Sequence, residues 1–306
     1  MSASAAPVGE AEEDWILAEL RQSGFAVLPG AVPADAAAAL GESLAPRLES
    51  TAFSQGWFNG RRSRRCHGLL AGGGPATRFV LDPRVLAVAE ALLLPHCDSL
   101  QLNLTQASEI HPGEIAQIPH RDQDMWGGPK GCMDYVLNVV WPLTRFEAGN
   151  GGTRLWPGSH RRPDAAILPE EQAVCPALEP GDALLFLGAT LHGAGANRSP
   201  APRRAMIVSY CLGWLKPFEN MWLTYPPEVA CTFPPALQEL IGYKRHRPNL
   251  GSWQGGCPSR LLEKGAPRPA GASDALRPDQ IGRLAAWARG QRDVEPAAAL
   301  AAGMWG

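Results

Sequence analysis

The stretch Leu100-Gln-Leu-Asn-Leu-Thr105 alternates apolar and polar residues and decides the fold class. Side chains at every second position of an extended strand share a face, so this stretch predicts a half-buried β-strand with its leucines on one face. Five more strand candidates follow at close spacing, bounded by Gly, Pro or Asn: 115–119, 135–142, 153–156, 183–187 and 205–214. Because no helical stretch separates each pair, the pattern favours an antiparallel sandwich or barrel over a doubly wound sheet.

Helical patterns lie on both sides of this strand-rich stretch. They cover 13–22, 35–48, 83–94 and 234–243, and a short strand is expected at 25–28. We therefore expect a single, mainly β domain over residues 1–265 with helices at its N-terminal end. Residues 266–306 are rich in Ala, Pro and Arg, which predicts a peripheral tail, partly helical or disordered, with one amphipathic helix at 279–289.

The composition is that of an ordinary globular chain and excludes several classes of protein. The 306 residues carry 28 Lys and Arg against 30 Asp and Glu, a net charge of −2. Because the charges nearly balance, the chain lacks the excess of positive charge that would hold a phosphate backbone, and we do not expect it to bind nucleic acid. The 33 glycines and 29 prolines favour many short elements over a helical bundle. No run of 18 apolar residues is present, so the sequence predicts no membrane span.

The N-terminal stretch and the cysteines indicate a cytoplasmic protein. Residues 1–30 carry Glu10, Glu12, Glu13 and Asp14, where a signal peptide needs positive charge and then an apolar run. The seven cysteines form no C-x-x-C pair, so we expect reduced thiols and neither a disulfide framework nor a zinc knuckle. The chain is expected to act as a monomer or a homodimer.

Two H-x-D triplets are present, His96-Cys-Asp98 and His120-Arg-Asp122. One such triplet is expected by chance at this composition, so the context has to separate them. His120 ends a strand candidate, and residues i and i+2 of an extended segment point to the same side, so His120 and Asp122 could bind one metal ion. His96 follows a helical run that Pro95 ends, and we expect it on a connecting loop.

His192 is the best candidate for a third metal ligand, because the apolar strand candidate 183–187 brings it to a strand end. Two imidazoles and one carboxylate on one face of an octahedron leave three positions open, as in non-haem Fe(II) oxygenases. Arg203 follows eleven residues later and offers a planar fork to a carboxylate. On a strand the adjacent Arg204 would point to the opposite face, and the spacing favours Arg203.

Several motifs occur in a fixed order along the chain: His120-x-Asp122, Pro157-Gly-Ser-His160, Pro180-Gly-Asp182, and His192 with Asn197 and Arg203. Their order and spacing, from about Gly24 to Tyr243, resemble the phytanoyl-CoA dioxygenase (PhyH) family of Fe(II)/2-oxoglutarate oxygenases. Gln117, three residues before the first histidine, and the stretch Trp214-Leu-Lys-Pro-Phe-Glu-Asn220 are similar to the branch that tailors natural products.

The resemblance implies a double-stranded β-helix, a jelly-roll or cupin-like fold, with helices packed on one side. It implies three ligands for Fe(II): His120, Asp122 and His192. It also implies that Arg203 binds the distal carboxylate of 2-oxoglutarate, and that Gln117 and Thr153 contact the same cosubstrate. With O₂, such an enzyme oxidises an unactivated C–H of a small molecule, most simply by hydroxylation, and releases succinate and CO₂.

Four further residues are candidate substrate contacts. Arg65 and His67 lie in Asn59-Gly-Arg-Arg-Ser-Arg-Arg-Cys-His67, which could bind an anionic substrate, form a lid or be a solvated basic loop. Trp126 and Trp222 lie in loop-like contexts and could line an aromatic pocket. His160 and His111 are better explained as turn residues than as metal ligands.

Other functions stay open at this point. An acyl-CoA or lipid α-hydroxylase of the phytanoyl-CoA type would use the same ligands, although no residue points specifically to CoA. A catalytically silent cupin-like metal-binding protein is expected to lack Asp122 or Arg203, and both are present. A zinc hydrolase could use two histidines and an aspartate, but it would leave the arginine eleven residues after His192 unexplained.

Overall fold

The computed structural model describes residues 10–263 and 271–290. The chain divides into two compact units, residues 1–220 and 221–306, and each is described by itself. The predicted domain of residues 1–265 crosses this division, so its C-terminal limit stays a prediction. The predicted location and oligomeric state also stay predictions.

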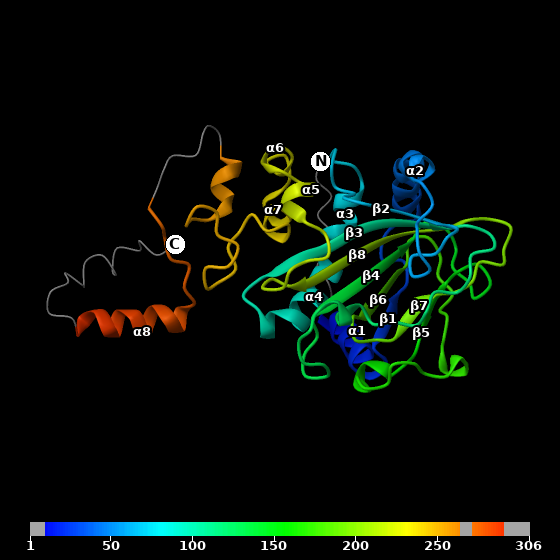
Figure 1. Cartoon of the computed structure of the whole chain (residues 1–306), viewed down its shortest axis with the longest axis horizontal. Coiled ribbons are helices and arrows are strands. Elements are labelled where there is room, and N and C mark those ends of the chain that lie inside the picture. Colours follow the sequence, from blue (N-terminus) through cyan, green and yellow to red (C-terminus); the bar gives the residue numbers. More distant parts are fainter. Residues whose placement is uncertain (1–9, 264–270, 291–306) are drawn as a thin grey trace. The chain divides into compact units, whose positions relative to one another are not determined.

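A six-stranded sheet, the major sheet, dominates the first unit (Figure 1). Its strand order is β1-β6-β4-β8-β3-β2, and every neighbouring pair is antiparallel. The strands are β1 (Phe25–Leu28), β2 (Ser63–His67), β3 (Leu100–Ile110), β4 (Val136–Pro142), β6 (Ala183–Leu187) and β8 (Arg203–Leu212). The predicted antiparallel, mainly β class is therefore confirmed.

A smaller sheet pairs β5 (Thr153–Leu155) with β7 (His192–Ala194). His120 extends it, because His120 and His192 exchange two backbone hydrogen bonds of 2.9 Å. The two sheets enclose a cavity lined by residues of both, and the fold is a double-stranded β-helix. The pairing brings together two histidines that are far apart in sequence.

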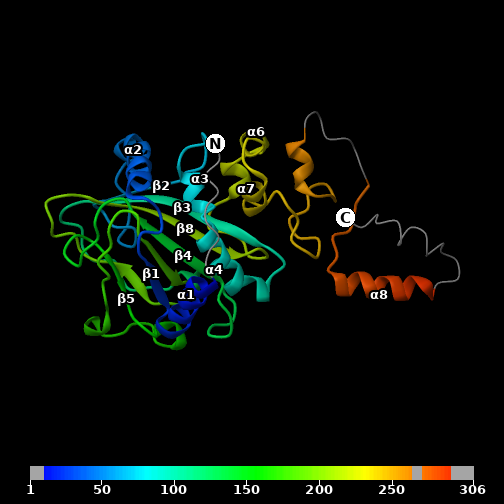
Figure 2. The same cartoon turned by 180° about the vertical axis from the view of Figure 1, so that it is seen from behind.

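Helices flank the major sheet in the first unit, as predicted (Figure 2). They are α1 (Glu10–Ser23), α2 (Ala34–Ser50), α3 (Ala76–Val80) and α4 (Pro83–Leu93), with the short 3₁₀ helices η1 (Leu94–His96), η2 (Asp122–Met125), η3 (Ser159–Arg161) and η4 (Glu170–Gln172). Tyr210 of β8 donates its hydroxyl to the Val80 carbonyl at 2.6 Å, and Trp141 of β4 packs edge-on against Phe79. Large aromatic side chains thus fix α3 to this face of the sheet.

The second unit is helical in the part that the structure describes. It contains α5 (Met221–Thr224), α6 (Pro227–Ala230), α7 (Pro235–Leu240), η5 (Pro258–Leu262) and α8 (Pro278–Arg289). The helices expected at 234–243 and 279–289 are confirmed as α7 and α8. The expected disorder of the tail falls partly on 264–270 and 291–306, outside the described residues. Within the described ranges, no helix has the length and apolarity needed to cross a membrane.

The strand expected at 115–119 is wrong. These residues form an irregular segment, and Ile115 and Ile118 are each 56% exposed. Pro119 has no N–H to donate, so a regular ladder cannot continue through it. Only Gln117, which donates its backbone N–H to Ala194, and His120 bond to β7.

The three leucines of the opening stretch do not share one face. The register of β3 shifts between Leu102, which lies opposite Tyr210, and Leu104, which lies opposite Ser209. This β-bulge turns Leu104 into the cavity while Leu102 stays in the core under the helices. The side chain of Asn103 stabilises the bulge, because its Nδ2 donates to Ser209 Oγ and its Oδ1 accepts from the Phe218 N–H.

Candidate metal centre and its cavity

The cavity between the two sheets has a volume of about 470 Å³, which is within the usual range for small-molecule sites. Seven predicted site residues line it: Arg65, Gln117, His120, Asp122, Thr153, His192 and Arg203. They come from both sheets and from the loops between them. The fold therefore gathers most of the candidate residues in one place.

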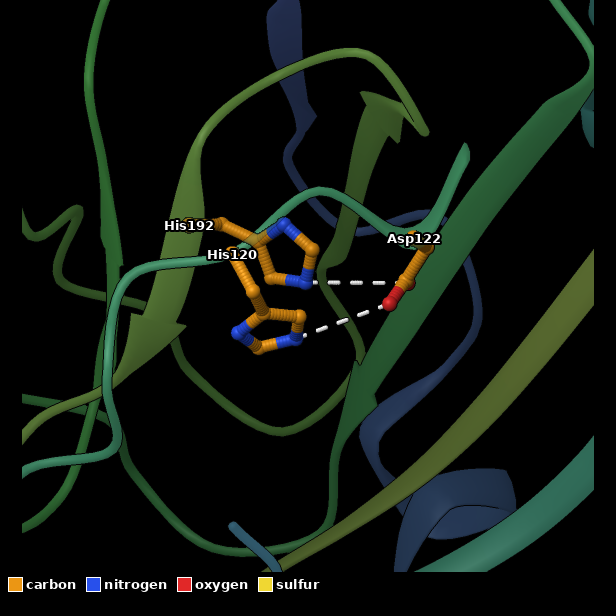
Figure 3. Close-up of side chains that lie close together, drawn as sticks. All are labelled: His120, Asp122 and His192. Carbon is orange, nitrogen blue, oxygen red and sulfur yellow. Dashed lines mark ion pairs between the residues drawn. The ribbon is translucent and has the colours of Figure 1, made fainter. Parts of the chain in front are cut away.

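His120, Asp122 and His192 converge at the wall of this cavity (Figure 3). Asp122 Oδ1 lies 3.5 Å from His120 Nε2, and Asp122 Oδ2 lies 3.6 Å from His192 Nε2. The three ligand atoms are all within 4.8 Å of one another. His192 begins β7, His120 is its bridge partner, and Asp122 begins η2, so the backbone positions all three.

Backbone carbonyls orient both imidazole rings. His120 Nδ1 lies 2.9 Å from the Ile118 carbonyl oxygen, and His192 Nδ1 lies 3.0 Å from that of Thr190. A carbonyl can only accept, so each Nδ1 carries a proton, which leaves Nε2, on the side of Asp122, as the nitrogen that can bind a metal. This is the usual arrangement of histidines that bind a metal through Nε2.

Electrostatics favours the same arrangement. Burial lowers the pKa of His192 to about 4, against the opposing effect of Asp122, so the ring is neutral at neutral pH. Burial raises the pKa of Asp122, but the two histidines and Arg65 lower it to about 2 overall, so the carboxylate is ionised. Two imidazole nitrogens and one ionised carboxylate that converge within 4.8 Å of one another can hold a cation between them. The residues therefore fit a divalent metal ion.

Arg203 is a buried cation in the same cavity. Its Nε and Nη2 donate to the Gly151 carbonyl at 3.0 and 2.6 Å, and its guanidinium lies 4.3 Å from the centre of the Phe146 ring. Among the described residues, no carboxylate lies within 4.0 Å of it. Burial lowers the pKa of Arg203 to about 9, and Arg65 contributes to the decrease, yet the group stays charged at neutral pH. An anionic ligand would compensate this charge.

Arg204 lies on the other face of β8, where its Nε donates to Glu109 Oε2 at 2.6 Å. Arg204 is thus paired within the protein, whereas Arg203 faces the cavity. The expected opposition of these neighbours on a strand is observed.

Two predicted cosubstrate contacts also line the cavity. Gln117 accepts from the Ala194 N–H at 3.2 Å and donates to the Phe58 carbonyl at 3.1 Å, so its amide joins β7 to the loop at Phe58. Thr153, at the start of β5, is buried on the cavity wall. Their positions are compatible with a cosubstrate in the cavity.

The substrate candidates divide into two groups. Arg65 lines the cavity and donates to Gln106, and His67 lies one step further, 2.8 Å from the Gln106 amide nitrogen. Trp126 instead donates to the Lys216 carbonyl, and Trp222 in the second unit donates to that of Gly242. Neither tryptophan belongs to the lining of the cavity, and their roles stay predictions.

The other histidines have local roles. His96 lies exposed in η1, which replaces the loop that was expected there. His160 contacts the Arg21 carbonyl through Nε2 at 3.0 Å, and His111 contacts Glu109 at 2.6 Å. Within the described ranges, neither belongs to the metal-ligand cluster.

Sequence reasoning missed two cavity residues, Asn138 and Phe58. Asn138 Nδ2 is buried without a hydrogen-bond partner and is a free donor at the cavity. The Phe58 ring packs edge-on against His120, 4.8 Å between centroids. A signal for Asn138 existed, because it is the one polar residue of the buried run Val136–Pro142. Phe58 precedes an irregular segment and carried no comparable signal.

A jelly-roll fold that holds two histidines and one carboxylate at its cavity is typical of facial-triad metalloproteins. The model of the phytanoyl-CoA dioxygenase (PhyH) family matches residues 20–205. The chain belongs to this family, as the sequence motifs predicted.

Similar proteins carry dioxygenase names. The dioxygenase cdmA of Talaromyces verruculosus is 36% identical over 163 residues, which cover 52% of this chain and 55% of cdmA. The multifunctional dioxygenase ausE of Aspergillus calidoustus is 27% identical over 254 residues, which cover 76% of this chain and 85% of ausE. The chain spans little more than half the length of cdmA and of several other curated relatives.

A solved structure supports the fold. The epimerase SnoN from nogalamycin biosynthesis, in complex with Fe3+, alpha ketoglutarate and nogalamycin RO, aligns with a TM-score of 0.55. It is 22% identical, and the alignment covers 67% of this chain and 85% of SnoN. At this identity the likeness establishes the double-stranded β-helix and no more.

Proposed function

We propose that this protein is an Fe(II)/2-oxoglutarate-dependent dioxygenase that hydroxylates an unactivated C–H of a small molecule in natural-product biosynthesis. One oxygen atom of O₂ enters the new alcohol and the other enters succinate, while the cosubstrate loses CO₂. The proposal rests on one observation. The same cavity contains a set of three metal ligands and the cation Arg203, which has no carboxylate partner among the described residues.

The residues of this chain take distinct roles in that reaction. His120, Asp122 and His192 would hold the metal ion and leave its other coordination positions to the cosubstrate and O₂. Arg203 binds the distal carboxylate of 2-oxoglutarate. Bound Fe(II) supplies the activation of O₂.

Polar and apolar residues of the cavity complete the site. Gln117, Thr153 and the free donor Asn138 are available to the cosubstrate. Val140 and Ile207 form part of an apolar wall that limits the access of water to the reacting C–H.

The comparisons support this assignment. Relatives named dioxygenases share about a third of their residues with this chain over the matched segment. The similar SnoN structure contains Fe3+, alpha ketoglutarate and nogalamycin RO. These names favour a tailoring oxygenase over the acyl-CoA hydroxylase that the family name suggests.

Anaerobic titration of the metal-free protein with Fe(II) and then 2-oxoglutarate tests the proposal. A weak visible charge-transfer band is expected only when both are present, because the 2-oxo acid must chelate iron at open positions. Asp122→Ala is the matched variant that should lose the band. Bound iron without any band would contradict the proposal and favour a catalytically silent metal site.

A further inference from the structure

Arg121 lies between two of the metal ligands, in His120-Arg-Asp122, and it is buried. Its guanidinium donates to four backbone carbonyls: Nε to Ala189 at 2.9 Å, Nη1 to Ala165 at 2.8 Å, and Nη2 to Arg162 at 3.1 Å and to Ser159 at 3.3 Å. The same side chain therefore bonds to two segments of the chain that are far from it in sequence.

Three of the four carbonyls belong to the loop that begins with the motif Pro157-Gly-Ser-His160. They lie in or just after the short helix η3. The last carbonyls of a helix have no intrahelical partner, and an arginine can donate to them. Arg121 thus connects this motif, to which the proposed reaction gives no role, to the segment that carries two metal ligands.

The fourth carbonyl, that of Ala189, lies in the turn that leads to His192. The next residue is Thr190, whose carbonyl accepts from His192 Nδ1 and orients the ring. Beside this contact, Gln123 donates its backbone N–H to the Gly188 carbonyl at 3.0 Å. The guanidinium therefore bonds to the turn one residue before the carbonyl that orients the third ligand.

Ser159 connects the same loop to His192 by a second route. Its Oγ accepts from the Leu191 N–H at 2.8 Å, while its carbonyl accepts from Arg121. Trp156 donates its backbone N–H to the Leu191 carbonyl at 3.0 Å. Both backbone groups of the residue before His192 are therefore bonded to this loop. Ser159 is fully buried, so loss of its hydroxyl would deprive a buried N–H of its partner.

The hydrogen bonds of the Arg121 guanidinium are made within the protein. Burial lowers the pKa of Arg121 below its usual value, Asp124 opposes this decrease and Arg162 adds to it. Asp124 forms its ion pair with Lys130, 3.4 Å away. Hydrogen bonds from a charged donor are stronger than neutral ones, so the four carbonyls can compensate for the burial of the cation. A cation bonded in this way holds the structure around it and is not left free to bind a ligand.

We propose that Arg121 is a positioning residue for the metal ligands. Its guanidinium holds the segment of His120 and Asp122 against the turn that leads to His192, and Ser159 completes the connection. This inference rests on the proposed function, because it concerns the metal centre of the same site.

Titration of the metal-free protein with Co(II) tests the inference, because the visible absorption of bound Co(II) depends on the geometry of its ligands. Arg121→Gln should raise the Kd for Co(II) by about 10–100-fold, as is typical for outer partners of metal ligands, and should shift the absorption bands. Arg121→Lys keeps the charge but cannot reach both segments from one ammonium group. It should restore only part of the affinity.

Arg161→Gln is the matched control. Arg161 lies in the same loop, is exposed and donates to a backbone carbonyl outside this network, that of Arg21, at 3.2 Å. The variant loses the same charge and a hydrogen bond of the same kind. It should leave the Kd for Co(II) and the absorption bands unchanged.

Ser159→Ala keeps the test decisive if Arg121→Gln does not fold. It removes one hydroxyl and should weaken Co(II) binding in the same direction, by less than Arg121→Gln. Urea unfolding of the metal-free variants separates positioning from general stability. A folded Arg121→Gln or Ser159→Ala protein that is less stable, yet has an unchanged Kd and unchanged bands, would overturn the inference.

Failure of the proposed function has a different signature. The unmodified protein would then bind Co(II) but lack the band that depends on Fe(II) and 2-oxoglutarate. Absence of Co(II) binding to the unmodified protein would instead overturn the role of Arg121, because no metal centre would be left to position.

Discussion

On the two faces of β8, neighbouring arginines have opposite partners: Arg204 pairs with a carboxylate, and Arg203 donates to a backbone carbonyl. On the outer face Arg204 pairs with the buried Glu109, which also contacts His111 at 2.6 Å and Arg64 at 3.6 Å. On the inner face Arg203 is more deeply buried than Arg204, yet its contacts within the described residues are a backbone carbonyl, a hydroxyl and an aromatic ring. Burying an unpaired charge is unfavourable, so the inner face is incomplete without a ligand, whereas the outer face is complete.

The largest effect is expected in the cavity that the inner face of β8 lines, where Asp122 of η2 supplies the carboxylate of the metal-ligand set. Asp122→Ala should reduce iron affinity by more than the roughly 10–100-fold typical of outer partners of metal ligands, and should abolish turnover coupled to succinate release. Iron content after dialysis and succinate formation measure the two effects. A variant with full activity would remove Asp122 from the site.

Arg203→Ala and Arg204→Ala test the comparison directly. Arg203→Ala should raise the apparent KM for 2-oxoglutarate by about 100-fold, because it removes the buried guanidinium that donates two charge-assisted hydrogen bonds to a carboxylate. Arg204→Ala should leave this KM within about 3-fold, because Arg204 points away from the cavity. Steady-state succinate formation at varied 2-oxoglutarate measures both. If Arg204→Ala had the larger effect, the assignment of the two faces would be reversed.

The ion pairs on the outer face of β8 should contribute less to the free energy of unfolding at acid pH. Burial raises the pKa of Glu109, but Arg204 and His111 lower it overall below its usual value of 4.5. Ionised Glu109 therefore contributes stability above about pH 4.5, and this contribution is lost as the pH falls through the lowered pKa. Glu109→Gln should reduce the free energy of unfolding by about 1–3 kcal/mol at pH 7. The difference from the unmodified protein should shrink below pH 4.5, as followed by urea unfolding at several pH values.

The smallest effect is expected at the second H-x-D triplet. His96 lies exposed in η1 outside the cavity, so His96→Ala should leave iron binding and turnover unchanged within error. The same succinate assay checks it. An inactive variant would mean that the wrong triplet was chosen.

The elements that the sequence predicted well depend on local chemistry. The continuous apolar run Ala183–Leu187 and the glycines and prolines beside it specify a buried strand wherever it packs. The same period of two places Arg203 and Arg204 on opposite faces. The spacing of His120 and Asp122 likewise permits a shared ligand position before any pairing is known.

Other features depend on which segments meet. The bulge at Asn103 is stabilised by hydrogen bonds to Ser209 and Phe218. Because of this bulge, Leu104 lies on the face of β3 opposite to the one expected from the alternation. The approach of Arg65 to Asp122 requires β2 to pair with β3. None of these partners lies within ten residues of the group it affects.

By itself, then, the sequence determined the strand-rich class, the family and the identity of the candidate ligands, because these follow from residue type and short-range periodicity. Only the tertiary structure decided that Arg203 is buried without a carboxylate, that Arg65 shares its cavity and that Asn138 offers a free donor there. Whether a charge is paired or unpaired is a property of the groups around it, and strand pairing over long sequence distances brings those groups together.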